Sequence, residues 1–173
     1  MPILSRLRTT AAILVTGLFL TAAIAADQPA PLRVNAEMLD GSRFSLEHGR
    51  GSITLLSLWS PDSLASRKCL GELQRFHAAY ESRGVKVVAI ATVNDAPTLR
   101  AFAAKRKLNL PVAMLGEHNI GPLPEHQLPI VLVFDRDGNL VASRAGLFSY
   151  RMLEVLAVPP LMKPVSGTAA QPG

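Results

Sequence analysis

The stretch that decides the fold reads LWSPDSLASRKCLGEL and runs from Leu58 to Leu73. It begins at the end of a short apolar run, Ile53 to Trp59, which has the length and composition of a strand buried on both faces. Pro61 then breaks the strand, and Asp62 and Ser63 after it are residue types that cap helix N-termini. Apolar residues recur at helical spacing over residues 64–82, which predicts an amphipathic helix. A strand is therefore expected to lead into a helix close to Ser63.

A second strand and helix follow directly. Val85 to Val93 is another apolar run of strand length, and Asp95 is placed to cap a helix with Pro97 in its first turn. The alternation of strand, helix, strand and helix at this spacing predicts a parallel βαβ unit with a right-handed crossover.

Two hairpins are expected to flank this unit. The first joins strands at 32–38 and 43–46 through the turn Asp40-Gly41, and the second joins strands at 130–134 and 140–144 through Asp137-Gly138. Between and after them we expect a short strand at 112–115, a loop at 116–127 that includes a turn of helix, and a last amphipathic segment at 148–158. The whole pattern predicts one α/β domain over residues 30–158, with a mixed central sheet, an N-terminal hairpin and flanking helices.

This order of elements resembles the thioredoxin superfamily, in particular the TlpA/ResA-like branch of periplasmic thiol–disulfide oxidoreductases. That branch typically carries Phe-Trp-Ala-Thr-Trp-Cys-Pro-Pro-Cys-Arg-x-Glu-x-Pro-Glu-Leu, which aligns with residues 58–73 without gaps and matches at Trp59, Arg67, Glu72 and Leu73. The run LPIVLVFDRDG, residues 128–138, resembles the family's Val-Pro-Thr-Thr-Phe-Leu-Ile-Asp-x-Asp-Gly, whose proline is cis. The resemblance implies a thioredoxin-like fold and the label of a redoxin in cell redox homeostasis.

Ser63 and Ser66 fall at the positions of the family's two redox cysteines, which makes Ser63-Leu64-Ala65-Ser66 a degenerate CxxC motif. Dithiol exchange needs a thiolate at the helix N-terminus, where the helix dipole lowers its pKa, and a second thiol to resolve the mixed disulfide. A hydroxyl is a far weaker acid and forms no exchangeable sulfur–sulfur bond. We therefore expect no dithiol chemistry, with Ser63 acting as a helix cap and Ser66 as an ordinary residue of the first turn.

Cys69 is the only cysteine of the chain, so an internal disulfide is excluded. It lies six residues after Ser63, beyond the turn in which a helix dipole acts strongly. Neighbouring Arg67 and Lys68 are expected to lower its thiol pKa modestly. We interpret Cys69 as a packing residue, with a monothiol role through a mixed disulfide or dimer bridge as the alternative.

Pro129 has a second implication. In the family the cis-proline lies against the redox site, and the backbone before it pairs with an extended peptide, a form of recognition that requires no cysteine. The resemblance therefore implies a peptide-binding groove at Trp59, Leu128 and Pro129, to which His118 and His126 could also contribute. Core packing explains Trp59 equally well, and a requirement of backbone geometry explains Pro129.

Other chemistries find little support in the sequence. The four histidines are dispersed without the spacing of metal ligands, and no Gly-rich phosphate loop is present, so no metal or cofactor is expected. The formal net charge is +5, but the basic residues form no patch interleaved with aromatic residues, so nucleic acid is not an expected partner.

The N-terminus reads as a targeting segment. Arg6 and Arg8 precede an uncharged run, residues 9–26, which ends in an Ala23-x-Ala25 cleavage pattern. We expect residues 1–25 to be a signal peptide and the protein to be periplasmic. The alternative is an uncleaved inner-membrane anchor formed by residues 9–26, with the domain facing the periplasm. Residues 159–173, which include four prolines, are expected to form a disordered tail.

These expectations combine into one functional hypothesis: an exported, redox-inactive thioredoxin-fold protein that binds a peptide or assists assembly. Its partner would be an extracytoplasmic protein or peptide, including one that contains a thiol. The alternative is an enzyme, namely a monothiol oxidoreductase or a peroxide-reactive protein that acts through Cys69.

Overall fold

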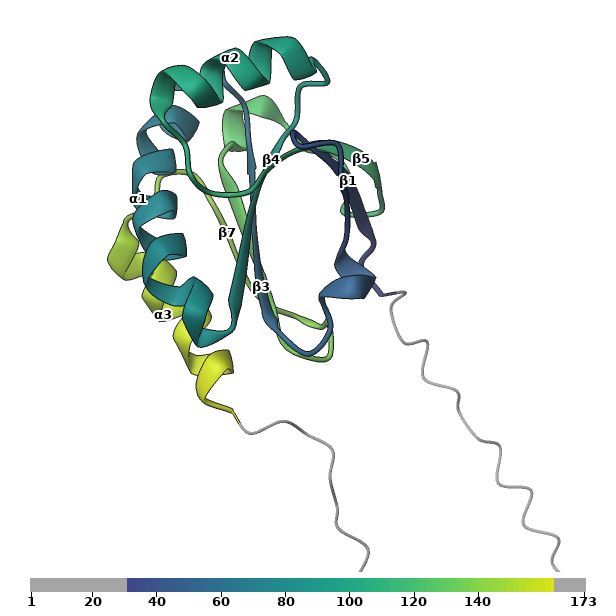
Figure 1. The fold of residues 1–173 in the computed structure, drawn as a ribbon. Helices are drawn as coiled ribbons and strands as arrows, with labels where there is room; N and C mark the ends of the chain where they lie inside the picture. The colour runs from purple at the N-terminus through teal and green to yellow at the C-terminus, as the bar shows by residue number, and fades with distance from the viewer. Residues whose placement is uncertain (1–30, 164–173) are drawn as a thin grey trace, which may run out of the picture.

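The computed structural model describes residues 31–163, which form a seven-stranded mixed sheet with three α-helices (Figure 1). The strands are β1 Val34–Met38, β2 Arg43–Ser45, β3 Ile53–Trp59, β4 Val85–Ala91, β5 Val112–His118, β6 Ile130–Phe134 and β7 Leu140–Ala145. Their order across the sheet is β2-β1-β5-β4-β3-β6-β7. The predicted fold class is confirmed.

β3 lies inside the sheet, between β4 and β6. β3 pairs in parallel with β4 and antiparallel with β6, so that Leu56 lies between Val88 and Leu132. All seven residues of β3 are buried, as the continuous apolar run predicts. Side chains alternate between faces, because Leu55 and Trp59 belong to one buried cluster whereas Leu56 and Leu58 belong to the other.

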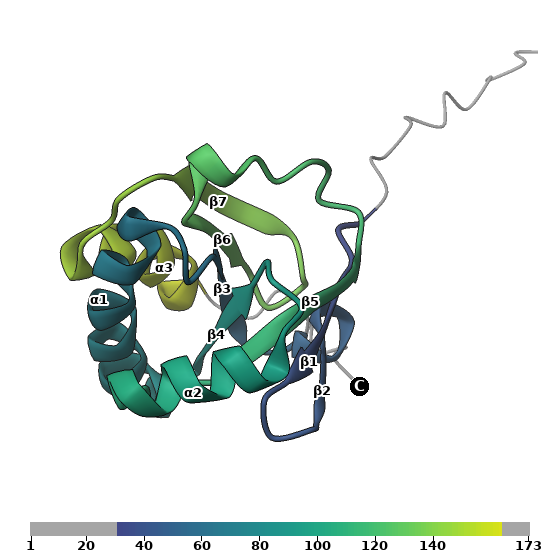
Figure 2. The same cartoon turned by 90° about the horizontal axis from the view of Figure 1, so that it is seen from above.

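Helices cover one face of these central strands. α1 Leu64–Tyr80 and α3 Tyr150–Met162 lie side by side, and α2 Ala96–Arg106 crosses near the end of the sheet where α1 begins (Figures 1 and 2). Leu73 and Phe76 of α1, Leu99 of α2 and Leu153 of α3 share one apolar cluster with β3 and β4. The second cluster, on the other face, is closed by the N-terminal hairpin of β1 and β2.

Several element boundaries differ from the predictions by a few residues, and two of them show what decides the boundary. β5 continues to His118, three residues beyond the predicted end, because β1 offers a partner that reaches Val34 opposite His118. The residues added, Gly116-Glu117-His118, carry no apolar pattern that would indicate a strand. In the hairpin, β2 ends at Ser45 and the chain forms a 3-10 turn over Leu46–Gly49.

The last helix corrects the prediction that the tail starts at residue 159. α3 continues through Pro159 and Pro160 to Met162, although proline interrupts helical hydrogen bonding. The guanidinium of Arg136, in the β6–β7 turn, donates to the carbonyls of Leu161 (3.0 Å) and Lys163 (2.6 Å). Pro160 is buried, so packing and this side-chain cap hold the final turn.

Residues 1–25 and the alternative anchor at 9–26 lie outside the described residues, as does the remainder of the tail, 164–173. Within residues 31–163 no helix is long and apolar enough to cross a bilayer.

Candidate functional site at the start of α1

The first turn of α1 is held by the hydroxyl of Ser63. Ser63 is the N-cap, with extended backbone angles, and its Oγ accepts a hydrogen bond from the N–H of Ser66 at 3.2 Å. This satisfies one of the N–H groups that every helix start leaves unpaired. The predicted capping role of Ser63 is confirmed.

Ser66 is buried and acts on the loop before the helix. Its Oγ accepts from the N–H of Ser60 at 3.3 Å, and the Oγ of Ser60 accepts from the N–H of Asp62 at 3.2 Å. Arg67 holds the same loop from outside, because its Nη1 donates to the carbonyls of Pro61 (2.7 Å) and Asp62 (3.0 Å). Ser66 is thus a structural residue of the strand-to-helix turn, a more specific role than its sequence position indicates.

The loop that carries Pro129 lies directly against Ser63. The Leu128–Pro129 peptide bond is cis, and the Ser63 hydroxyl donates to the carbonyl of Leu128 at 3.4 Å. The N–H of Leu128 donates to Glu125, and the carbonyl of Pro129 accepts from Gly146 at 2.8 Å. Three distant segments, around residues 63, 128 and 146, therefore meet at one end of the molecule.

The side chains of the three predicted groove residues, Trp59, Leu128 and Pro129, are buried, so only their backbone could take part in the predicted groove. Trp59 is 1% exposed, because strand alternation turns its side chain to the helix-covered face, where its ring lies 5.3 Å from that of Phe102. Leu128 and Pro129 are also buried. Their backbone, rather than their side chains, shapes this end of the protein.

The accessible site is a shallow depression of about 480 Å³ beside Ser63. Its lining is polar and consists of Ser60, Asp62, Ser63, Glu125 and His126. His126 contributes as predicted, whereas His118 lies at the end of β5, opposite Val34. Asp62 and Glu125 were not singled out as site residues, although their places next to Ser63 and three residues before Leu128 were a usable signal.

Two large apolar side chains are exposed on the segments that meet here. Leu64, the first residue of α1, is 58% exposed, and Leu147 is 56% exposed. Leu147 immediately follows Gly146, whose N–H donates to both Gln127 and Pro129. Exposed leucines on two of the converging segments are an apolar complement to the polar depression.

Cys69 lies in the core and takes no part in this surface. It is 2% exposed; its Sγ accepts from the N–H of Phe148 at 3.3 Å, and its thiol reaches the Phe148 carbonyl at 3.5 Å. Burial raises the pKa of the Cys69 thiol and the charge of Glu72 raises it further, outweighing the opposite effect of the Phe148 hydrogen bond. The expected pKa-lowering effect of Arg67 and Lys68 is therefore wrong, because desolvation dominates.

A metal centre finds no support within residues 31–163, where no three His, Cys, Asp or Glu side chains group as ligands. The chemistry available at the start of α1 is that of hydroxyls, one imidazole, two carboxylates and exposed apolar surface.

The mixed sheet, its helix-covered face, and a cis-proline loop against the start of α1 define a thioredoxin-like fold. The Chlorobium tepidum thiol:disulfide interchange protein of the thioredoxin family superposes with a TM-score of 0.65 at 19% identity, covering 79% of this chain and 99% of that one. A secreted thiol-disulfide isomerase from Corynebacterium glutamicum gives a TM-score of 0.65 at 16% identity, covering 76% and 84% of the two chains.

Residues 26–149 match the AhpC/TSA family, and the chain belongs to it. The thiol-disulfide oxidoreductase ResA of Bacillus cereus is 24% identical over 122 residues, covering 67% of this chain and 68% of ResA. These likenesses agree on the TlpA/ResA-like branch of the thioredoxin superfamily. This chain has the fold of that oxidoreductase group but a single cysteine.

Proposed function

We propose that this protein is an exported thioredoxin-fold module that binds a peptide or protein partner at the start of α1 and performs no dithiol exchange there. The main support for the proposal is the surroundings of three side chains, Ser63, Ser66 and Cys69. Ser63 and Ser66 are both engaged in backbone hydrogen bonds, and the only thiol, that of Cys69, is buried nearly two turns further along α1.

The ungapped alignment of residues 58–73 supports a loss of redox chemistry, since it puts Ser63 and Ser66 where the family has cysteines. Neither hydroxyl offers a route for electrons. Cys69 lacks the two features of a reactive thiol, exposure and a lowered pKa, so its environment favours packing over monothiol or peroxide chemistry.

The surface supports partner binding. Leu64 and Leu147 supply exposed apolar area, and Leu64 directly follows Ser63, which lines the depression together with Asp62, Glu125 and His126. The backbone N–H of Leu128 donates to Glu125, so strand-like pairing at that position requires the turn over Glu125–Gln127 to open. While this turn stays formed, we expect side-chain contacts with an apolar segment of the partner to dominate the binding.

Export is supported by residues 1–25, which have the order of a signal peptide. The Corynebacterium glutamicum neighbour is a secreted protein, which fits the same destination. Fusing residues 1–30 to a reporter that folds only outside the cytoplasm tests this part separately. Reporter activity is the expected result, and a silent fusion would contradict export.

The redox part is tested by insulin reduction with dithiothreitol, with the variant Ser63→Cys/Ser66→Cys as the matched control. Wild type should not accelerate the reaction above background, whereas the double variant should gain activity on the order of tenfold or more, because its first thiol lies at the helix N-terminus. Clear turnover by the wild type that disappears in Cys69→Ala would establish the monothiol alternative instead. A folded double variant without activity would contradict the assigned positions.

The binding part is tested by capture of partners from periplasmic extract under non-reducing conditions. Wild type and Cys69→Ser should retain the same protein, and Leu64→Glu/Leu147→Glu should lose it. Retention that depends on Cys69 would show that a disulfide, rather than this surface, holds the partner.

A further inference from the structure

A separate cavity lies beside the first half of β4, where the sheet is open. β4 begins at Val85, yet its pairing with β5 covers only Ala89–Ala91. Pro111, whose carbonyl accepts from Ala89 at 2.9 Å, has no N–H with which to continue the ladder. The edge of β4 from Val85 to Val88 therefore borders a cavity of about 420 Å³ instead of another strand.

The walls of this cavity are mainly apolar. Met38 of β1, Phe44 of β2, Pro111 and the valines of β4 supply its apolar lining. The volume lies within the range of small-molecule sites, which are typically apolar with a few polar groups. A thioether and a phenyl ring are favourable neighbours for an aromatic ligand.

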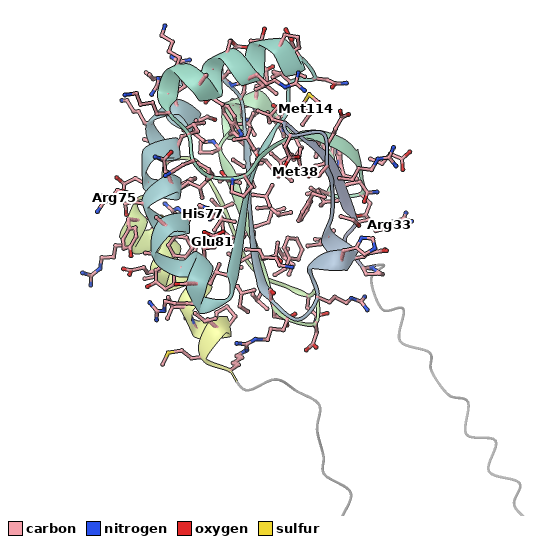
Figure 3. The ribbon with its side chains drawn as sticks, in the orientation of Figure 1. Arg33, Met38, Arg75, His77, Glu81 and Met114 are labelled. Carbon is pink, nitrogen blue, oxygen red and sulfur yellow. The ribbon has the colours of Figure 1, made fainter. Side chains whose placement is uncertain are left out.

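The polar residues that line the cavity are Ser52, Glu81, Lys86 and His77. Of these, His77 is the buried one, and it lies near the C-terminal end of α1 (Figure 3). His77 is 7% exposed, and its Nε2 lies 3.6 Å from the Oε2 of Glu81. Its Nδ1 is buried and has no hydrogen-bond partner among the described residues. In the neutral ring the carboxylate favours the proton on Nε2, which leaves Nδ1 as an unsatisfied acceptor. A buried acceptor without a partner is unfavourable, and a ligand that donates a hydrogen bond to it would remove that cost.

We propose that this cavity binds a small aromatic molecule that bears a hydroxyl group. The ring would lie among Met38, Phe44 and Pro111, and the hydroxyl would donate to the imidazole of His77. His77 lines the cavity, and because χ2 of histidine has a broad range, the proposal requires its ring to turn until Nδ1 faces the bound hydroxyl. The site is independent of the proposed function, because His77 lies roughly 20 Å along α1 from Ser63.

The test is an NMR titration of the purified chain with phenol and, separately, with toluene, which has the same shape but no donor. Phenol should shift the amide signals of Val85 to Val88 and the Nδ1 signal of His77, and toluene should shift only the amides. In His77→Phe the ratio of the toluene Kd to the phenol Kd should fall roughly three- to tenfold, the value of one hydrogen bond. His48→Phe, at an exposed histidine away from this cavity, should leave the ratio unchanged.

Two results would overturn the proposal. One is a phenol titration of the wild type that leaves Nδ1 of His77 unshifted, which requires no variant to fold. The other is binding whose amide shifts centre on Ser63 and Glu125, because the aromatic site would then be the depression at the start of α1.

Discussion

Two positions of α1 give a side chain different surroundings. One is the start of the helix at Ser63, and the other is Cys69, six residues further along. At the start, the hydroxyls of Ser63 and Ser66 satisfy backbone N–H groups that would otherwise be unpaired. At Cys69 the side chain is enclosed by the core and touches the backbone of Phe148. A helix start therefore supplies polarity and access, whereas nearly two turns further in the same helix supplies burial. A thiol in the second environment is a packing group.

The largest expected effect concerns access to the Cys69 thiol. In the native protein its reaction with iodoacetamide at pH 8 should be at least about 100-fold slower than in urea, because labelling must await opening of the core. A thiol at the helix start, provided by Ser63→Cys in a Cys69→Ala background, should label rapidly in the native state. Equal native rates at the two positions would remove the distinction between them.

Packing is the next largest effect. Cys69→Ala should lower the free energy of unfolding by about 1–2 kcal/mol, since it leaves a small cavity and removes the sulfur contacts to Phe148. Chemical denaturation measures this loss. Because Cys69→Ala removes packing without placing a polar group in the core, no loss would mean that the sulfur contributes nothing to the core.

Capping gives a comparable or smaller effect at the start of the helix. Ser63→Ala should cost about 1 kcal/mol, and Ser63→Asp should recover most of it, because aspartate also caps and favours the helix dipole. The same denaturation experiment tests both variants. A loss with alanine that aspartate fails to recover would assign the effect to the hydrogen bond with Leu128 instead of the cap.

The smallest effect compares the caps of two helices. Asp95 caps α2 through Thr98, whose hydroxyl, followed by its backbone N–H, lowers the pKa of the carboxyl. A lowered folded-state pKa contributes stability above the unfolded value of about 3.9, and this is lost as pH falls through the folded-state value. The stability difference between wild type and Asp95→Asn should therefore shrink between pH 5 and pH 2. The difference between wild type and Ser63→Ala should not change, because serine does not titrate.

Local pattern was sufficient for most of the fold. The apolar run Ile53–Trp59 is β3 to the residue, and Ser63 and Asp95 cap α1 and α2 as their types predict. Sequence failed where a distant partner decides the outcome. β1 extends β5 through residues without an apolar pattern, and Arg136 holds two prolines in the last turn of α3.

The site was predicted less completely, for a related reason. The family resemblance placed Pro129 beside the position of Ser63, and the structure has the two segments in contact, but the orientation of Trp59 depends on which face of β3 the helices cover. The pKa of Cys69 depends on burial under Phe148, a residue 79 positions away. The sequence neighbours Arg67 and Lys68 led to the prediction of a lowered pKa for Cys69. The direction was wrong because these residues do not determine the dielectric surroundings of the sulfur.

The hydrogen bonds from Arg136 to the end of α3 have a practical consequence for handling the protein. They fix Leu161 and Lys163 near the β6–β7 turn, at the opposite end of the molecule from the start of α1 (Figure 1). A sensor chip that tethers the chain through its C-terminus would hold the surface with Leu64 and Leu147 outward, whereas coupling through random lysines would give mixed orientations.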